Sequence, residues 1–326
     1  MSNDRRLEQS PTNLGDLEYI FPTQVEAKKD LLEDAFLQLG EQKGLTVDQT
    51  YGNYPYPFLN FLIPTWARYS SWLISKKNGI VQAVINIHLG VDIDHNRYLI
   101  HTSTVKEGIA ILPEVIQHLH PTTSIFRFTI PVPQMDYPDT QVQERLNHAG
   151  FEQDSESRTV AQMYWQSIDH FKFYTQITQG DTLIDPLGLQ YYSEAEELFE
   201  RNYDISSFHA KELRKKQHSG LVRNINSEEI EPNLIAVSGR TEIIPARRKI
   251  AIIRDTVVDT PFRNGKRGLF LASKQAEHIY NKGGEIIGID AINTESQRGA
   301  AYLGAELLEW RRWYRARRRS NGALGE

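Results

Sequence analysis

The chain has 326 residues, a length that suits two modest domains or one large one, and its 40% hydrophobic and 24% charged residues are typical of a globular protein. With 37 Lys and Arg against 42 Asp and Glu, the formal net charge of −5 is too acidic for a generic binder of nucleic-acid phosphates. The absence of cysteine excludes disulfide frameworks, thiolate metal sites and a cysteine nucleophile.

The N-terminal sequence up to Tyr19 has neither the apolar core nor the small-residue cleavage site of a signal peptide. No apolar run approaches the roughly 18 residues that a membrane-spanning helix needs. We therefore expect a cytoplasmic protein with no membrane span.

The first half of the chain is expected to combine a helix, an antiparallel meander and a sheet with crossover helices. Thr23-Gln24-Val25-Glu26 matches a capping box and predicts a helix over 24–39, whereas prolines and aromatic residues over 51–65 indicate an irregular, packed segment. The Asn78-Gly79 pair predicts a hairpin between two strands. The elements expected from there on are strands at 66–75, 80–89 and 97–105, a helix at 109–119, a strand at 125–130, a helix at 140–148 and a strand at 159–166.

The second half repeats this order of elements. Ser193 and Glu196 match another capping box before a helix at 195–202. The elements expected after it are a charged helix at 209–218, strands at 233–238, 242–244 and 249–258, a turn at 263–268, a helix to Tyr280, a strand at 285–292, a helix at 297–303 and a strand at 307–315. The repeat predicts a duplicated α/β chain with a first domain over 1–168, a linker over 169–185 and a second domain over 186–326. Chance similarity between two α/β halves is the alternative.

A strand that runs into a tight turn before a helix marks the second half. The sequence from Val257 to Gly268 there reads VVDTPFRNGKRG. The unpaired N–H groups and the dipole of a helix N-terminus form an anion site, and glycine lets a phosphate approach the backbone. This segment, with the next strand and Asn293, resembles the acyl-CoA-binding half of the GNAT acyltransferase superfamily. A solvated basic turn is the alternative explanation.

The resemblance implies both the fold and the cosubstrate. It implies two tandem GNAT-like domains of mixed, mostly antiparallel sheets flanked by helices, with acyl-CoA (acetyl-CoA or longer) bound by the second and no metal. In the family, the strand after the turn splays from its neighbour and leaves room for the pantetheine arm. Of the family's turn pattern, Arg263 and Gly268 are present, but Lys266 replaces the middle glycine. The cofactor-binding residues implied are Val257, Val258, Arg263, Asn264, Gly265, Lys266, Arg267, Gly268 and Asn293.

Many members of this family use a tyrosine as general acid toward the leaving thiolate. The family spacing from Asn293 places that tyrosine at Ala300, two residues before Tyr302. Either Tyr302 acts from a shifted helix or no tyrosine acid is used. The second alternative is favoured, because two residues along a helix rotate a side chain by about 200°.

The first half carries the resemblance more faintly. Gly150-Phe151 matches the family's Gly-aromatic ending, but the turn at 104–108 has one glycine and an acidic residue, Glu107, which would repel a pyrophosphate. This degenerate half is therefore expected to have a structural or substrate-shaping role.

Acyl transfer to an amine needs a base that removes the ammonium proton. Asp255 and Asp259 lie four residues apart on the strand-to-turn segment and share a face, with Asp255 nearer the middle of the sheet. The alternative is that both are ordinary strand-end carboxylates. Asp290, inside an apolar strand, is a second candidate base, because burial raises the pKa of an unpaired carboxyl group.

The ten histidines show no metal-binding spacing, since His118 and His120 stand two residues apart and do not face each other on a helix. No metal site is expected. The sequence also lacks a GxSxG elbow, a P-loop and a kinase signature.

The C-terminal stretch from Trp310 to Arg319 carries six arginines interleaved with aromatic residues. This pattern is typical of nucleic-acid surfaces, and equally of an edge or closing strand with exposed arginines. It makes tRNA, an acyl-carrier protein or a CoA phosphate candidate partners of this end of the chain.

These features predict an N-acyltransferase that moves an acyl group from acyl-CoA directly to a small-molecule or peptide amine. Direct transfer fits the absence of cysteine. Two alternatives stand beside it. Fem-type aminoacyl-tRNA-dependent ligases also resemble two fused GNAT units and lack an intact CoA turn, and a degenerate, non-catalytic pair could bind a ligand or act as a scaffold.

Overall fold

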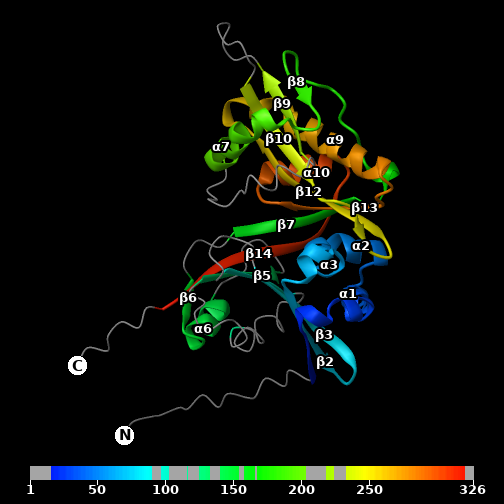
Figure 1. Cartoon of the computed structure of the whole chain (residues 1–326), viewed down its shortest axis with the longest axis vertical. Coiled ribbons are helices and arrows are strands. Elements are labelled where there is room, and N and C mark those ends of the chain that lie inside the picture. Colours follow the sequence, from blue (N-terminus) through cyan, green and yellow to red (C-terminus); the bar gives the residue numbers. More distant parts are fainter. Residues whose placement is uncertain are drawn as a thin grey trace, which may run out of the picture. The chain divides into compact units, whose positions relative to one another are not determined.

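The computed structural model describes residues 16–89, 97–102, 116, 125–132, 140–153, 158–165, 167–202, 218–223 and 233–319 (Figure 1). The chain divides into two compact units, each built from separate stretches of sequence. Unit 1 consists of Met1–Leu39, Arg68–Ser157 and Arg312–Glu326, and unit 2 of Gly40–Ala67 and Arg158–Arg311.

Unit 1 contains a sheet in the order β1-β2-β3-β4-β5-β14. Neighbours from β1 to β4 are antiparallel, and β4 and β5 are parallel. Its elements are β1 (Asp16–Ile20), most of α1 (Lys29–Gln42), β2 (Ser70–Lys77), β3 (Ile80–Leu89), β4 (Arg97–Thr102), β5 (Ile125–Val132), α6 (Thr140–His148), β6 (Phe151–Gln153) and the last part of β14 (Glu306–Arg318).

The hairpin between β2 and β3 confirms the turn prediction. Asn78 and Gly79 have φ angles of 53° and 76°, which is the left-handed pair that a two-residue turn between twisted strands requires. The antiparallel meander β2-β3-β4 is likewise as predicted.

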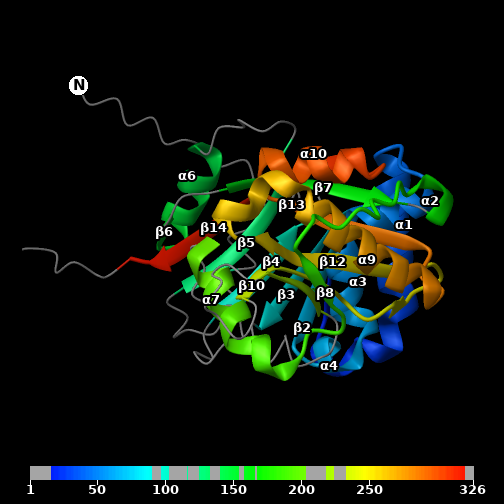
Figure 2. The same ribbon diagram turned by 90° about the horizontal axis from the view of Figure 1, so that it is seen from above.

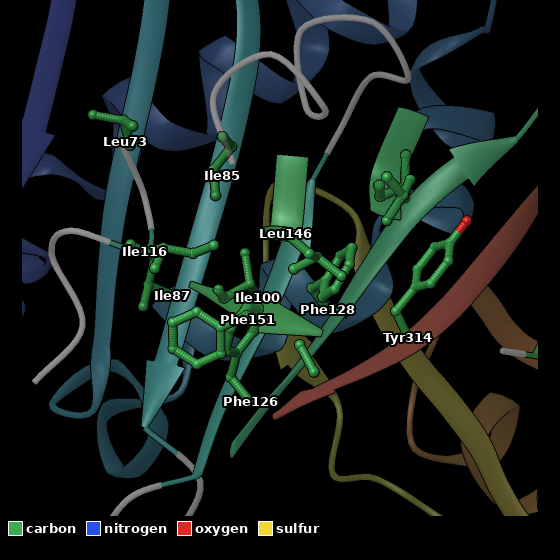
Figure 3. Close-up of a cluster of buried hydrophobic side chains, with 13 residues drawn as sticks. Leu73, Ile85, Ile87, Ile100, Ile116, Phe126, Phe128, Leu146, Phe151 and Tyr314 are labelled. Atoms are coloured by element: carbon green, nitrogen blue, oxygen red, sulfur yellow. The ribbon is translucent and has the colours of Figure 1, made fainter. Parts of the chain in front are cut away.

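Aliphatic and aromatic side chains together form the core of unit 1 (Figure 3). Phe126 and Phe128 of β5 are fully buried, and Phe151 meets Phe126 with ring centroids 4.9 Å apart. The ring of Tyr314 on β14 stacks on Phe128 at 4.8 Å. The last strand of the chain therefore completes the core of this unit.

Unit 2 contains sheet strands in the order β7-β13-β12-β10-β9-β8, with β11 paired to β12. Its strands are β7 (Arg158–Trp165), β8 (Thr182–Ile184), β9 (His218–Arg223), β10 (Asn233–Arg240), β11 (Ile244–Pro245), β12 (Lys249–Val258) and β13 (Ile286–Ala291). Its helices are α2 (Val47–Asn53), α3 (Pro55–Leu62), α4 (Pro64–Ala67), α7 (Tyr192–Asn202), α9 (Arg267–Asn281) and α10 (Thr294–Tyr302), with the 3-10 helix η5 (Thr260–Gly265) before α9.

Helices α7 and α9 cover opposite faces of this sheet. Helix α9 lies along β9, β10 and β12 (Figures 1 and 2). It buries Phe270 against Ala236. Helix α7 buries Leu198 against Val237, the next residue of β10, whose side chain points to the other face. We refer below to the α9 face and the α7 face.

The prediction of an irregular segment over 51–65 is wrong, because this stretch is helical. Pro55 stands in the first turn of α3, where a helix has no use for the missing N–H group, and Pro64 begins α4. The expectation that its aromatic residues pack is confirmed, since Tyr51, Tyr54 and Phe58 are buried.

Other boundaries also differ from the predicted ones. Two short 3-10 helices precede α1, so the α-helix begins at Lys29. His218 begins strand β9 instead of ending a helix. The rest of the helix predicted at 209–218, and the helix at 109–119 except Ile116, lie outside the described residues.

Each unit includes the last strand of the other half of the sequence. Strand β7 pairs antiparallel with β13 in unit 2, from Ile287–Trp165 to Ala291–Ala161. Residues 312–318 of β14 belong to unit 1, next to β5 and paired with β6. The division into halves at 168 and 186 remains a prediction about duplication, because the two units are defined by contacts.

None of the helices in the described ranges combines the length and the apolar character that a membrane span requires.

Candidate functional site

Strands β12 and β13 are paired over only part of their length. Their parallel ladder runs from Ile250–Ile286 to Ile252–Gly288, whereas β12 continues to Val258 and β13 to Ala291. Beyond Ile252 the facing main-chain groups of the two strands are not joined to each other. Such unjoined strand edges can bind an extended ligand through main-chain hydrogen bonds.

On its other side, β12 carries a β-bulge. The register with β10 passes from Gly239–Arg254 to Val237–Val257, so Asp255 and Thr256 together stand opposite one residue. Asp255 has a φ angle of 55°, a left-handed conformation that strands of L-residues rarely contain. The bulge lies next to the point where β12 leaves β13.

The chain leaves β12 through η5 and enters α9. Lys266, with a φ angle of 55°, is the N-cap residue of α9, and no side chain caps the helix among the described residues. The first N–H groups and the positive end of the helix dipole therefore form an anion site. A Cβ atom on Gly268 would lie 3.6 Å from Val258 and 3.9 Å from Thr256, so packing within the chain does not require glycine there.

Arg267 fixes the position of this turn through buried polar contacts. Its side chain is buried, and its Nε atom lies 2.6 Å from Oδ2 of the buried Asp181. The same guanidinium donates to the carbonyl oxygen of Phe262 at 2.8 Å. Asp181 also pairs with Arg223 of β9, at 2.6 Å.

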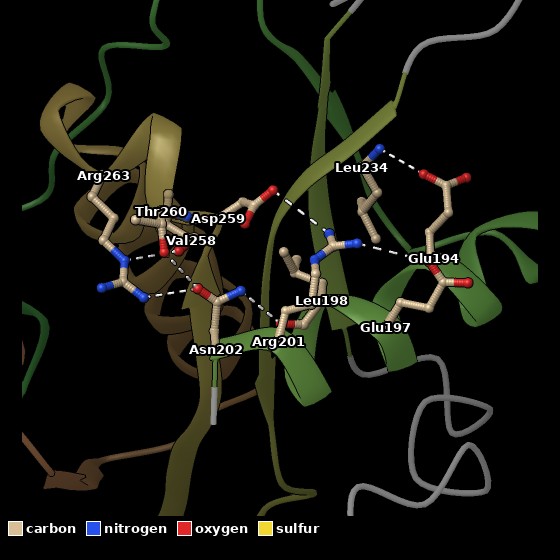
Figure 4. A network of polar contacts seen from close by, with 10 residues as sticks. All are labelled: Glu194, Glu197, Leu198, Arg201, Asn202, Leu234, Val258, Asp259, Thr260 and Arg263. Atoms are coloured by element: carbon tan, nitrogen blue, oxygen red, sulfur yellow. Dashed lines mark hydrogen bonds and ion pairs between the residues drawn. The ribbon is translucent and has the colours of Figure 1, made fainter. Parts of the chain in front are cut away.

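Arg263 ties the turn to the end of α7 (Figure 4). It donates to the carbonyl oxygen of Val258 at 3.2 Å and to Oδ1 of Asn202 at 2.8 Å. Thr260 donates to the same Asn202 oxygen at 3.2 Å, and Arg201 of α7 lies 3.6 Å from Asp259. These contacts fix the position of η5 relative to α7.

The Lys266 ammonium group lies between two tyrosine rings. It is 5.3 Å from the ring centroid of Tyr174 and 5.6 Å from that of Tyr302. Tyr302 is the last residue of α10 and is 54% exposed. An exposed cation and an exposed phenol therefore stand beside the N-terminus of α9.

No family model matches the sequence, and no curated protein matches it either. Three solved structures resemble the whole chain in fold. They are a Drosophila protein (TM-score 0.60, 12% identity, 94% of this chain and 99% of that one), a GCN5-related N-acetyltransferase from Sphaerobacter thermophilus (TM-score 0.57, 11% identity, 93% and 96%) and a tandem GNAT protein from the clavulanic acid biosynthesis pathway (TM-score 0.53, 12% identity, 94% and 100%).

The chain has the GNAT fold. Coverage of nearly all of both chains by a tandem GNAT protein confirms the predicted tandem architecture of mixed α/β sheets flanked by helices. At this level of identity the likeness concerns the fold, and the site must be argued from the residues.

The residues predicted to bind the cofactor lie at one end of unit 2. Val257 is buried in the α7 face and Val258 lies beside Gly268, while Asn264 and Gly265 close η5. Asn293 is the N-cap of α10, where its Oδ1 accepts a hydrogen bond from the N–H group of Ser296 at 2.8 Å. The structure thus gives Asn293 a capping contact, and its binding role stays a prediction.

Asp255 is held by two basic side chains. Its Oδ2 atom lies 2.6 Å from Nε of Arg254 and 3.5 Å from Nε2 of His218. Burial alone would raise the pKa of Asp255, but Arg254 and His218 outweigh burial and hold this pKa below the ordinary value. Asp255 is therefore ionised at neutral pH.

Asp290 is paired with Gln162 of the adjacent strand β7. Ile287 and Ala291 of β13 pack in the core with α9 and α10, so Gly288 and Asp290 point to the opposite face. Pro55 of α3 lies on that face, 2.8 Å from where a Cβ of Gly288 would stand. Asp290 therefore lies on the face of the sheet opposite the α9 face.

Sequence reasoning missed His218 and Asp181. His218 falls at the end of the charged helix predicted at 209–218, and Asp181 falls in the linker predicted at 169–185. Neither position has a local sequence signal that marks it as functional. Among the described residues, no group of three or more His, Asp or Glu side chains is arranged to hold a metal ion.

Proposed function

We propose that the protein is an N-acyltransferase whose unit 2 binds an acyl-CoA and transfers its acyl group directly to an amine. The observation that carries this proposal is the early end of the β12–β13 ladder, directly before the uncapped N-terminus of α9. The GNAT fold supports the reaction class.

The residues present suit the two ends of acyl-CoA. The unjoined edges of β12 and β13 offer main-chain groups to the amides of a pantetheine arm, and the first turn of α9 offers N–H groups to a pyrophosphate. A glycine in a first helical turn costs stability relative to alanine. Because no contact with the described residues requires glycine at 268, close approach of a phosphate is a reason for its presence.

Lys266 adds a mobile positive charge to this turn in place of the family's middle glycine. Its ammonium group is exposed and already lies beside Tyr302. A lysine there strengthens binding to phosphate oxygens as a point charge. Arg263 and Arg267 contribute by fixing the turn through Asn202 and Asp181.

The reaction needs one base and one acid. The ammonium group of the acceptor first loses a proton to a base, and the nitrogen lone pair then forms a C–N bond with the thioester carbonyl carbon. The C–S bond breaks, its electron pair leaves with sulfur, and the thiolate takes up a proton. The products are an amide and free CoA, and no acyl group is attached to the protein.

Asp255 and Asp290 are the candidate bases, and Tyr302 is the candidate acid. Asp255 lies at the bulge where β12 leaves β13, and Asp290 lies on the part of β13 beyond the last residue paired with β12. Tyr302 lies beside the α9 turn, where the pyrophosphate is proposed to bind, so its assignment as the acid rests on the family resemblance alone. A small-molecule or peptide amine is the proposed acceptor.

Thermal unfolding with CoA and acetyl-CoA tests the binding step. The wild-type protein should gain several degrees in Tm at ligand concentrations well above Kd, because a ligand that binds only the folded state stabilises it. Gly268→Asp places a carboxylate against the first turn of α9 and should abolish this gain. Leu189→Asp adds the same charge at an exposed site of unit 2 and should leave the gain intact.

Release of free CoA thiol from acetyl-CoA, measured with a thiol reagent against a panel of amines, tests the transfer step. The chain has no cysteine, so the reagent detects only CoA. Equal CoA affinity in Gly268→Asp and wild type would refute the binding site. Stabilisation by charged tRNA instead of CoA would favour the aminoacyl-tRNA-dependent ligase, and CoA binding without turnover of any amine would favour a non-catalytic module.

A further inference from the structure

Asp255 is in an unusual backbone conformation for a strand residue. Of the three non-glycine residues with positive φ in the described ranges, Asn78 is in a hairpin and Lys266 at a helix N-terminus, whereas Asp255 lies inside β12. A conformation of this kind is unfavourable and persists where the surroundings determine it. An observed outlier of this kind motivates a search for a function of its side chain.

His218 fills the space behind this carboxylate. Its ring lies against Gly239 of β10, so close that a Cβ atom on residue 239 would stand 2.5 Å from the ring. Glycine at 239 therefore makes room for an imidazole in the sheet. His218 is 3% exposed and the side chain of Asp255 is 19% exposed, so Asp255 is the outer member of the pair.

The other charged side chains near Asp255 and His218 make contacts of their own. Arg254 holds Oδ2 of Asp255 from the same strand. On α7, Glu194 accepts from the N–H group of Leu234 and Arg201 pairs with Asp259. Before β9, Asp185 pairs with Ser219 and with His278. Within the described residues, His218 is thus the imidazole that contacts the candidate base.

We infer that Asp255 and His218 form a proton relay, in which Asp255 takes a proton from the ammonium group of the acceptor and passes it to Nε2 of His218. This inference rests on the proposed acyltransferase function. The relay leaves a neutral amine, an ionised Asp255 and a protonated His218, so charge and protons balance. His218 does not touch the acceptor and acts through Asp255.

The relay solves a chemical difficulty of the site. A carboxylate whose pKa lies below the ordinary value is a weak base toward an ammonium group. An imidazole is the side chain that exchanges protons most readily near neutral pH. The pair of an anionic aspartate and an imidazolium keeps the transferred proton in a favourable ion pair.

The test is the pH profile of kcat for an amine that the wild-type protein acylates. The wild-type profile should have an acid limb, called here the imidazole limb, because the relay requires a neutral His218. In His218→Gln the imidazole limb should disappear and kcat at neutral pH should fall at least about tenfold, with KM for acetyl-CoA within about threefold. The ionisation of the amine contributes equally to all profiles.

Three further variants separate the relay from a structural role. Asp255→Asn tolerates the same left-handed backbone and should lower kcat at least about 100-fold. Gly239→Ala displaces the His218 ring without changing any charge and should weaken the imidazole limb. His278→Gln removes a different histidine–aspartate contact, 2.5 Å long, from the α9 face and should leave the profile unchanged.

Each outcome decides between the relay and the proposed function. All variants should keep the CoA-dependent gain in Tm, which shows that they fold and bind. An imidazole limb that persists in His218→Gln, or activity of Asp255→Asn near the wild-type value, would overturn the relay while leaving the acyltransferase intact. Absence of both a CoA-dependent gain in Tm and any turnover in the wild type would refute the proposed function and the relay with it.

Discussion

Each unit contains a parallel strand pair that follows an antiparallel meander, and the two pairs differ in how much of their length is joined. In unit 1, β4 pairs with β5 from Arg97–Ile125 to His101–Thr129, which is nearly the whole of β4. In unit 2, the corresponding pair β12–β13 is joined at three positions and then separates, although β12 is a longer strand. In both units the pair follows an antiparallel meander.

This difference bears on which unit carries the chemistry. A complete ladder satisfies the main-chain groups of both strands and leaves none for a ligand, whereas an incomplete ladder leaves groups that a ligand can use. The turn that would follow β4, at 104–108, lies outside the described residues. That this half is structural or substrate-shaping stays a prediction.

The largest effect expected in unit 1 comes from removing a core ring. Phe126→Ala should cost about 3–5 kcal/mol of unfolding free energy, measured by urea denaturation, because it leaves a cavity among Phe128 and Phe151. CoA affinity, measured by calorimetry on the folded variant, should remain that of the wild type.

Phe270→Ala is the matched change in unit 2. Phe270 is buried on α9, one turn after the anion site, so its loss should cost a similar free energy and also weaken CoA binding. Equal losses of CoA affinity in both variants would remove the functional distinction between the units.

The second prediction concerns the stability of the protein at acid pH. His88 of unit 1 is buried, shares a hydrogen bond of 2.8 Å with Ser70, and has its pKa lowered by burial to about 4. An unfolded histidine titrates near 6.5, so the unfolded state binds the proton first and stability falls as pH drops from about 6.5 to about 4. The loss should reach about 3 kcal/mol in urea denaturation at pH 4 compared with pH 7.

His88→Gln should flatten this part of the pH dependence, because a glutamine does not take up a proton. A wild-type protein equally stable at pH 7 and pH 4 would contradict the burial of a neutral His88.

A third, smaller effect separates stability from binding within the α9 turn. Gly268→Ala should raise the unfolding free energy of the unliganded protein by about 0.5–1 kcal/mol, because the new Cβ meets only ordinary contacts and alanine favours a helix. The same methyl group should lower CoA affinity by obstructing the phosphate. A variant that is more stable and binds CoA as tightly as the wild type would show that the glycine serves no ligand.

Local signals predicted much of the fold, since periodicity and turn residues act within a few positions. The strand at 80–89, the hairpin at Asn78-Gly79 and the helix from the 263–268 turn to Tyr280 were all found this way. The helical character of 51–65 was missed because proline in a first helical turn looks the same in sequence as proline in a loop. The exchange of β7 and β14 depends on which distant strand each one joins, and no local pattern encodes that choice.

The residues of the candidate site were likewise predictable where they are contiguous in sequence and not where they come from distant segments. The turn from Asp259 to Gly268 is one continuous segment of sequence, so its residue types predicted an anion site. Asp181, which holds Arg267, and His218, which holds Asp255, come from segments 86 and 37 residues away in sequence. Only the pairing of β9 with β10, and of β10 with β12, brings His218 to the bulge.

The smallest effect is expected from the arginine-rich end of the chain. The strand β14 continues through this stretch to Arg318, where Arg317 pairs with Glu152 in the register with β6 and Arg318 stacks on the ring of Phe151 at 4.9 Å. The buried Ala316 makes truncation at this point a disruption of the unit 1 core, so charge-neutralising substitutions are the sharper test. Arg317→Gln with Arg318→Gln should change stability by less than about 1 kcal/mol.

The same double variant discriminates between an acyl-CoA donor and a tRNA donor. Binding of a polyanion falls steeply with salt, by about one unit of log–log slope for each phosphate contact, whereas a cosubstrate held mainly by main-chain donors is much less sensitive. CoA affinity between 50 and 200 mM salt should therefore be nearly the same for the variant and the wild type. A tRNA that binds the wild type, and whose plot of log affinity against log salt loses about two units of slope in the variant, would show that the arginines of β14 contact nucleic acid. The donor would then bind at unit 1 instead of unit 2.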